Sequence, residues 1–238
     1  MTPATRIQLG LALALLAAGC ATTQQTKLTD ESYCPFVGNT VCAELVTAEA
    51  PSRFGSGGKV AYLRYINPNA KWTSYKSILL QPVTYWAGDE AKLSVKDQHM
   101  LTNYFYQQLE KQLGTKFQLV SEPGPGVMRV QVAIDEATTA TPILRTISMI
   151  IPQARALATL KFLATGSYPF VGSAQAEAEI TDSETGQVLA AAVDRRIGGG
   201  ALGTAAQWQF GDAENAINAW AQQMTERLGA WTTGAATP

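Results

Sequence analysis

Cysteines are the residues of this sequence whose type and spacing point most directly to chemistry. The 238-residue chain contains three of them. Cys34 and Cys42 flank the short stretch Pro35-Phe36-Val37-Gly38-Asn39-Thr40-Val41, and an oxidising compartment favours a disulfide between them. A zinc site is disfavoured, because two thiols without a paired His or a further Cys cannot complete a tetrahedral site. We expect a disulfide between Cys34 and Cys42, with free thiols as the alternative.

The third cysteine, Cys20, follows an apolar run that ends in Leu16-Ala17-Ala18-Gly19. Its thiol stands where the lipoprotein pathway requires a nucleophile for a diacylglyceryl group. The segment resembles a bacterial lipobox, although Ala17 replaces the Leu that is commoner at the third position before the cysteine. We therefore expect Cys20 to be the first mature residue and to carry lipid. The alternative is a plain secreted protein with a chance cysteine.

The segment before Cys20 predicts where the protein is located. Its apolar part, from Ile7 to about Ala18, is too short for a membrane span, which needs about 20 apolar residues, and it fits a secretory signal. Ala21 follows the cysteine, and by resemblance to Gram-negative lipoproteins, in which Asp at this position marks inner-membrane retention, it indicates the outer membrane. We expect a lipid-anchored protein that faces the periplasm.

No other group of polar residues forms a recognisable catalytic or cofactor site. The only histidine, His99, has no metal-binding partner pattern, and no Gly-x-Ser-x-Gly motif is present. Glu177 and Glu179 have the spacing to share a strand face, but alternation on a solvent-exposed face explains them equally well. Asp194-Arg195-Arg196 could bind an anion or form local ion pairs. We expect no catalytic residues, no metal and no cofactor, and hence no enzymatic activity.

The overall charge argues against nucleic acid as a partner. The chain has 18 Lys and Arg against 19 Asp and Glu. Removal of the signal segment takes away only Arg6, which leaves 17 against 19 and a net side-chain charge of −2. This balance gives no basic surface for nucleic acid. The roughly 219 residues from Cys20 onward suit one domain with a tether, or at most a domain and a half.

The elements that must position these residues follow from hydrophobic periodicity. Ser94 can cap a helix in which Leu101, Tyr104, Phe105 and Leu109 form an apolar stripe. Pro82 interrupts a strand and predicts an edge or a bulge there. We expect the remaining main elements to be strands at 60–65, 77–86 and 127–135, a hairpin at 172–196 and a final helix at 211–228. The many alanines of the hairpin indicate that another element packs closely against it.

The apolar stretch at 142–165 has no single interpretation. It shows helical spacing on both sides of Pro152. A membrane span is disfavoured, since three basic residues in the stretch would each cost about 3 kcal/mol near the bilayer centre. It either packs over the sheet or presents an apolar face to a partner or to the membrane surface. The residues that would form that face are Ile147, Ile150, Ile151 and Leu157.

The chain from about Lys59 to Trp231 resembles an uncharacterised bacterial lipoprotein family, domain of unknown function 3313. The matching stretches are Tyr65-Ile66-Asn67-Pro68-Asn69, Pro82-Val83-Thr84-Tyr85-Trp86, Glu122-Pro123-Gly124-Pro125-Gly126-Val127, Asp182-Ser183-Glu184-Thr185-Gly186 and Ala191-Ala192-Val193-Asp194-Arg195-Arg196. This resemblance implies location and domain identity, but it implies no activity and no functional residues. The Cys34–Cys42 segment lies outside it.

Together these patterns predict an α+β fold. We expect a mixed or antiparallel sheet, two main helices packed on one face, and a helical insertion. The predicted organisation is a lipoprotein signal peptide at 1–19, a lipidated tether and cysteine-loop lead-in at 20–58, a single domain at 59–231 and a disordered tail at 232–238. The expected function is a non-enzymatic binding or accessory component of the cell envelope with an unidentified envelope partner. The alternative is a carrier of a small apolar ligand or lipid in a pocket between sheet and helices.

Overall fold

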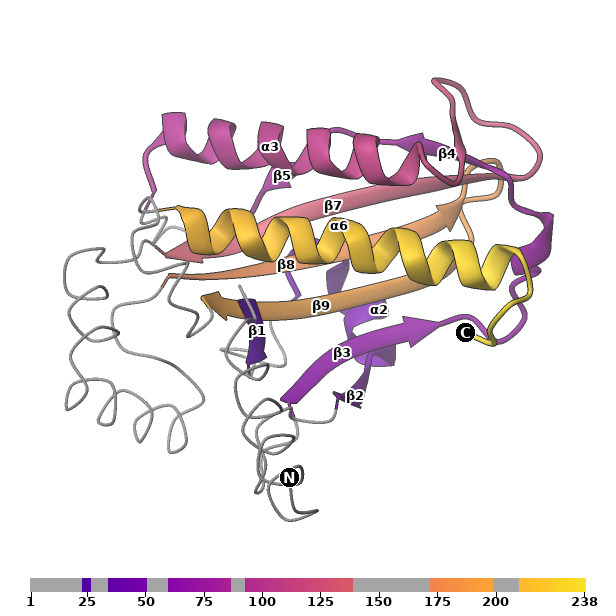
Figure 1. Cartoon of the computed structure of the whole chain (residues 1–238). Coiled ribbons are helices and arrows are strands. Elements are labelled where there is room, and N and C mark those ends of the chain that lie inside the picture. Colours follow the sequence, from indigo (N-terminus) through magenta and orange to yellow (C-terminus); the bar gives the residue numbers. More distant parts are fainter. Residues whose placement is uncertain (1–22, 27–33, 51–59, 87–92, 139–171, 199–209) are drawn as a thin grey trace, which may run out of the picture.

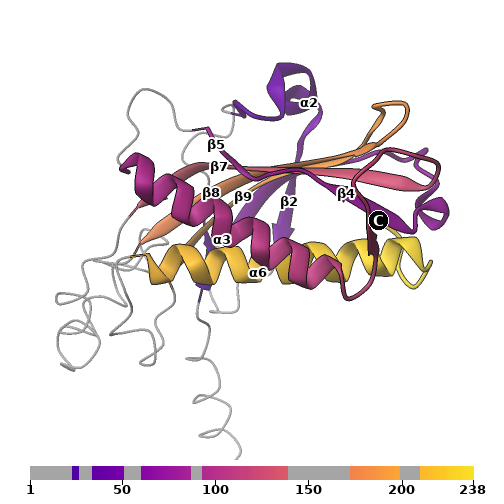
Figure 2. The same cartoon turned by 90° about the horizontal axis from the view of Figure 1, so that it is seen from above.

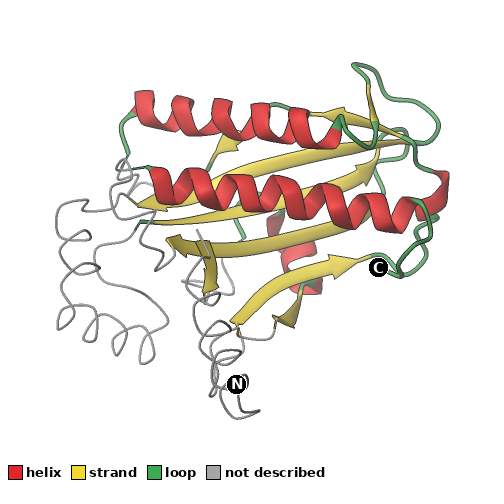
Figure 3. Ribbon diagram, viewed as in Figure 1, coloured by secondary structure: helices red, strands yellow, loops and turns green. Residues whose placement is uncertain are grey.

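The computed structural model of the chain describes residues 23–26, 34–50, 60–86, 93–138, 172–198 and 210–238. Two long helices cover one face of a mixed β-sheet (Figures 1 and 3). The predicted α+β class with helices packed on the sheet is therefore confirmed. The predicted helical insertion at 142–165 lies outside the described residues.

The sheet is built around a long central hairpin. Its strand order is β2-β3-β9-β8-β7-β4-β6, while β1 also pairs with β9 and β5 with β7. The pairs β4–β7, β4–β6 and β5–β7 are parallel, and the others are antiparallel. The strands are β1 (Thr23–Thr26), β2 (Val46–Ala50), β3 (Val60–Ile66), β4 (Ser77–Leu80), β5 (Thr84–Tyr85), β6 (Gln118–Leu119), β7 (Val127–Thr138), β8 (Ser173–Asp182) and β9 (Val188–Gly198).

The predicted interruption at Pro82 is present, because β4 ends before it and β5 begins after it. Both strands pair in parallel with β7. Proline has no N–H to donate to a strand ladder. The residue therefore lies in a gap between two strands that continue along the same neighbour.

Helices α3 (Val95–Leu113) and α6 (Gly211–Thr232) lie on one face of the sheet, as Figure 2 shows from above. Ser94 caps α3 as predicted, because its side chain accepts a hydrogen bond from the Asp97 N–H at 3.2 Å. The apolar sides of the two helices and the sheet form the main hydrophobic core. Among the described residues, no helix is both long enough and apolar enough to cross a membrane.

The opposite face of the sheet is covered by the cysteine segment, which includes the short helix α2 (Gly38–Glu44) (Figure 2). Cys34 and Val37 form a second, smaller core with Leu63, Ala191 and Val193. The alternating polar residues of β8 were expected to face solvent, but on this face Glu177 is 0% exposed. That expectation is wrong because the lead-in segment packs over the strand.

The two ends of the folded chain are more ordered than the sequence suggested. Thr23–Thr26, in the stretch predicted to be a tether, form β1 and pair with Arg195 to Gly198 of β9. The final helix continues past the predicted end to Thr232. The first residues of the tail predicted to be disordered form a hydrogen-bonded turn, in which the N–H of Gly234, at φ +71°, donates to the Trp231 carbonyl.

Candidate ligand-binding pocket

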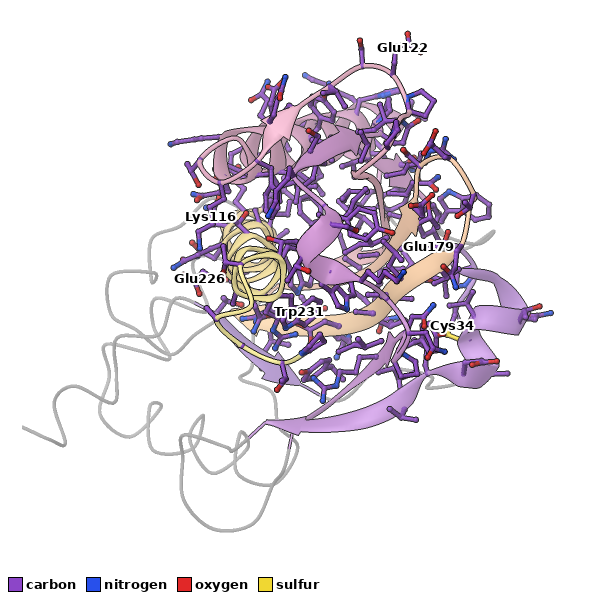
Figure 4. All side chains as sticks on the ribbon, turned by 90° about the vertical axis from the view of Figure 1, so that its right-hand side faces the viewer. Cys34, Lys116, Glu122, Glu179, Glu226 and Trp231 are labelled. Carbon is purple, nitrogen blue, oxygen red and sulfur yellow. A yellow bond between two sulfur atoms is a disulfide. The ribbon has the colours of Figure 1, made fainter. Side chains whose placement is uncertain are left out.

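A half-open pocket of about 110 Å³ lies between α6 and the strands β3, β8 and β9. Apolar cavities of about 150 Å³ in other proteins can hold a benzene ring, so the space is relevant to ligand binding. Figure 4 places Trp231 of α6 on the sheet side of that helix. The pocket is lined by Tyr62, Arg64, Tyr65, Ile66, Phe105, Val132, Ala176, Glu177, Ala178, Ile180, Ala190, Ala191, Ala192, Asp194, Trp220, Gln223, Met224, Arg227, Leu228 and Trp231.

The floor of the pocket is a row of residues that crosses four strands. Val132 of β7 pairs with Ala178 of β8, Ala178 pairs with Ala192 of β9, and Ala192 pairs with Arg64 of β3. Directly opposed residues of neighbouring strands lie on the same face of a sheet. Because the two central residues are alanines, the sheet leaves space beneath α6 at this row.

On the α6 side of the sheet, the most deeply buried side chains of the pocket lining are apolar and form its inner end. Phe105, Val132 and Leu228 line it and are at most 2% exposed. The Phe105 ring stacks on Trp220 with ring centroids 5.8 Å apart. An apolar group that reached this wall would leave water almost entirely, which is worth about 0.8 kcal/mol per methylene.

The outer end of the pocket is polar and carries positive charge. Arg227 of α6 donates from Nη2 to the Tyr62 hydroxyl at 3.2 Å, and its guanidinium carbon lies 5.3 Å from the centroid of the same ring. Arg64 and Gln223 also line the pocket and are partly exposed. These residues connect the apolar interior with solvent.

Among the described residues, one carboxylate lines the pocket on its α6 side, and it is already balanced by a cation. Asp194 accepts a hydrogen bond from the Trp220 indole N–H at 2.8 Å. It also forms an ion pair with Arg196 at 3.2 Å, and Arg196 in turn donates to Gln223. Of the two interpretations of the Asp194-Arg195-Arg196 stretch, this pair corresponds to the local ion pair.

A second polar cluster lies on the other face of the sheet. The Glu177 carboxylate accepts hydrogen bonds from the backbone N–H groups of Phe36 at 3.1 Å and Val37 at 2.9 Å. The pKa of Glu177 is raised to about 7, chiefly by burial and in part by the nearby Asp135 carboxylate, while the hydrogen bonds from Phe36 and Val37 oppose the shift. The pKa of Asp135 is also raised by burial, while its hydrogen bond from Gln175 opposes the shift.

The structure does not unite the charged residues that could have formed a catalytic site. Glu177 binds the lead-in segment on one face of the sheet, whereas Asp194 and Arg196 contact α6 on the other. Glu179 is half-buried and His99 is exposed on α3. Among the described residues there is no group of three or more His, Cys, Asp or Glu side chains that could hold a metal ion.

The cysteine prediction is confirmed for the described pair, since Cys34 and Cys42 form a disulfide. Figure 4 shows Cys34 across the sheet from α6. Cys20 lies outside the described residues, as do Ile147, Ile150, Ile151 and Leu157. Their predicted roles in lipidation and partner binding stay predictions.

Sequence reasoning did not identify Arg64 and Arg227, the two arginines at the outer end of the pocket, which we call the pocket mouth. Arg64 interrupts the apolar strand segment at 60–65, and Arg227 directly precedes Leu228 on the apolar side of the last helix. A cation inside an otherwise apolar pattern was the available signal. The sequence could not predict that both residues line one pocket, because this depends on the pairing of β3 with β9 and on the packing of α6 against β9.

Comparisons with solved structures show remote likenesses. The PelC dodecamer from Paraburkholderia phytofirmans is 9% identical, with coverage of 68% of this chain and 94% of that one and a TM-score of 0.37. Protein XCC0632 of family DUF330 from Xanthomonas campestris is 10% identical, with coverage of 71% and 92% and a TM-score of 0.41. A homologue of the neuraminyllactose-binding hemagglutinin from Helicobacter pylori is 9% identical, with coverage of 69% and 88% and a TM-score of 0.31. Likenesses this remote carry no argument about function.

The sequence comparison with curated proteins gave no match. The comparison with protein families gave a match over residues 51–224 to the family described as "Protein of unknown function (DUF3313)". This range includes the strands and helices that enclose the pocket, apart from the last residues of α6. The chain therefore belongs to the DUF3313 family.

Proposed function

We infer that this protein is a non-enzymatic binding component of the cell envelope that holds an apolar ligand between α6 and the sheet. The observation that carries this proposal is the pocket itself, which has a fully buried apolar inner wall and a half-open outer end. Ligand sites are typically concave and largely apolar, with a few polar groups that fix orientation. The lipobox-like segment around Cys20 supports a location at the periplasmic side of the outer membrane.

The pocket favours ligand binding over the other functions that the sequence left open. The docking face predicted at Ile147, Ile150, Ile151 and Leu157 has no geometry to support it, because those residues lie outside the described part of the chain. The charged residues considered for catalysis lie on opposite faces of the sheet. The pocket, in contrast, joins residues from four strands and both long helices.

The direct test uses two methionines as reporters. Met224 lines the pocket, whereas Met100 is 42% exposed on α3 and takes no part in it. With carbon-13 methyl-labelled methionine, the neutral apolar dye N-phenyl-1-naphthylamine should shift the Met224 signal in a saturable manner and leave Met100 unchanged. Dye binding without a Met224 shift, or no binding at all, would overturn the proposal.

A pocket-filling substitution provides the matched test. Ala192 is at the centre of the pocket floor and Ala43 is exposed on α2. We expect Ala192→Phe to weaken binding of the neutral dye at least tenfold by occupying the space, and Ala43→Phe to have no effect. Circular dichroism of both variants checks folding, and the methionine measurement on the unaltered protein does not depend on either variant.

A further inference from the structure

Within the described part of the chain, the pocket mouth contains two positive charges without a matching negative charge. Neither Arg64 nor Arg227 forms an ion pair with a carboxylate in the part of the chain that the structure describes. Asp194 is paired with Arg196, and the Glu177 carboxylate is bound to the lead-in on the other face. The mouth therefore has a local excess of positive charge although the whole chain is nearly neutral.

The two arginines reach the mouth from opposite sides. Arg64 is directly opposite Ala192, at the end of the floor row that begins at the buried Val132. Arg227 is held by Tyr62, whose position on β3 is two residues from Arg64 and thus on the same face. A guanidinium has five N–H donors, and the structure shows one contact of Arg227 to an acceptor.

The length of the floor row indicates how long a bound ligand would be. It crosses three strand-to-strand steps, which at about 4.8 Å each gives roughly 14 Å from Val132 to Arg64. Along this path the environment changes from completely buried and apolar to half-exposed and cationic. A molecule that matches this gradient has an apolar chain at one end and a negative charge at the other.

We propose that the pocket binds an anionic amphiphile, with its apolar chain along the alanine floor and its carboxylate or phosphate between Arg64 and Arg227. This assignment deepens the proposed function and rests on it. Arginine binds both carboxylate and phosphate through paired N–H donors. A free fatty acid and a phosphate-bearing lipid share this chemistry. A neutral apolar compound would fill the interior but leave both guanidinium groups without an anion.

The test compares ligands with the same chain and different ends. Decanoate, decyl phosphate and decanol compete for the pocket with the neutral naphthylamine dye. We expect at least one of the two anions to bind about tenfold more tightly than decanol, which corresponds to one charge-assisted hydrogen bond in a half-buried site. Preference for decanoate indicates a fatty acid, and preference for decyl phosphate indicates a phosphate-bearing lipid.

Arginine variants test whether Arg64 and Arg227 cause the preference for an anionic ligand. Arg64→Gln and Arg227→Gln should each lower the affinity for the preferred anion about tenfold and leave decanol affinity unchanged. Arg129→Gln is the matched control, because Arg129 is also half-buried but contacts the Ser183 carbonyl away from the pocket. Arg64→Lys, which keeps the charge, should restore part of the affinity and is less disruptive if Arg64→Gln folds poorly.

The outcomes separate this inference from the proposed function. Equal affinity for decanol and both anions, or arginine variants that lower decanol affinity as much as anion affinity, would overturn the anionic assignment and leave an apolar pocket. Failure of all three compounds to displace the dye would overturn the assignment. Failure of the dye itself to reach Met224 would also overturn the proposed function.

Discussion

At the scale of single residues, Glu177 shows how a charged group can be kept inside a sheet. One of its oxygens accepts two backbone N–H groups from the lead-in, whereas the other has no hydrogen-bond partner among the described residues. The Glu177 carboxylate also interacts with the carboxyl of Asp135, whose pKa is raised as well. Two neighbouring buried carboxyl groups favour states in which at least one of them is protonated.

The raised pKa of Glu177 predicts that the protein loses stability as the pH rises. The pKa of about 7 in the folded protein lies above the ordinary value of 4.5 for glutamate. The stabilising effect is therefore full below pH 4.5 and is lost as the pH rises through 7. We expect the free energy of unfolding to fall by about 2 kcal/mol over this range. Urea unfolding at a series of pH values measures it.

Glu177→Gln keeps an acceptor for the lead-in and removes the titrating group. The variant should have a smaller loss of stability between pH 4.5 and 7 and be more stable than the unaltered protein at pH 8. A residual slope from Asp135 is expected, because its pKa is raised too. Glu184→Gln, at an exposed turn position, is the control. If both variants kept the original slope, Glu177 would not be its source.

At the scale of elements, the disulfide stabilises the segment that covers the outer face of the sheet. It closes a short loop whose Phe36 and Val37 N–H groups bind Glu177. In the chain-entropy model, closing a nine-residue loop is worth about 2.5 kcal/mol. The disulfide therefore stabilises the same contact between the lead-in and β8 that buries the Glu177 carboxylate.

Replacement of Cys34 and Cys42 by serine should lower the free energy of opening this segment by about 2.5 kcal/mol. Hydrogen exchange of the Phe36 and Val37 amides measures the effect. The Val130 amide in β7 is the internal reference, because it lies in the centre of the sheet. Equal protection of the Phe36 and Val37 amides with and without the disulfide would contradict this role.

The elements with strong local patterns were predictable from the sequence. The Ser94 cap, the apolar stripe of α3, the hairpin of β8 and β9 and the start of α6 at Gly211 all agree with the structure. Each depends on periodicity or capping within one segment. Pro82 was also interpretable, because the missing N–H has the same consequence in any sheet.

Features that depend on contacts between distant segments were not predictable. The alternation of Glu177 and Glu179 is the same whether the outer face contacts water or a lead-in that begins about 140 residues earlier. The alanines of β8 and β9 correctly indicated that an element packs closely on them. They could not show that α6 leaves a pocket there, because its size depends on both surfaces.

At the scale of the whole molecule, the proposed anchor determines where the pocket operates. We expect Cys20→Ser to abolish metabolic labelling by radioactive palmitate and to release the protein from the membrane fraction. Cys34→Ser with Cys42→Ser is the matched control and should leave labelling intact, because these thiols are joined in the disulfide. A Cys20→Ser protein that remained labelled and membrane-bound would contradict lipidation at this residue.

The pairing of β1 with β9 has a consequence for the distance between the domain and the bilayer. Only three peptide steps separate Cys20 from Thr23, the first residue of β1, and a fully extended chain covers about 10 Å in that length. If Cys20 carries the anchor, this linker is too short for the domain to move far from the membrane into the periplasm. β9, which forms part of the pocket floor, would then remain close to the lipid headgroups. An amphiphile that leaves the membrane would first meet the protein there.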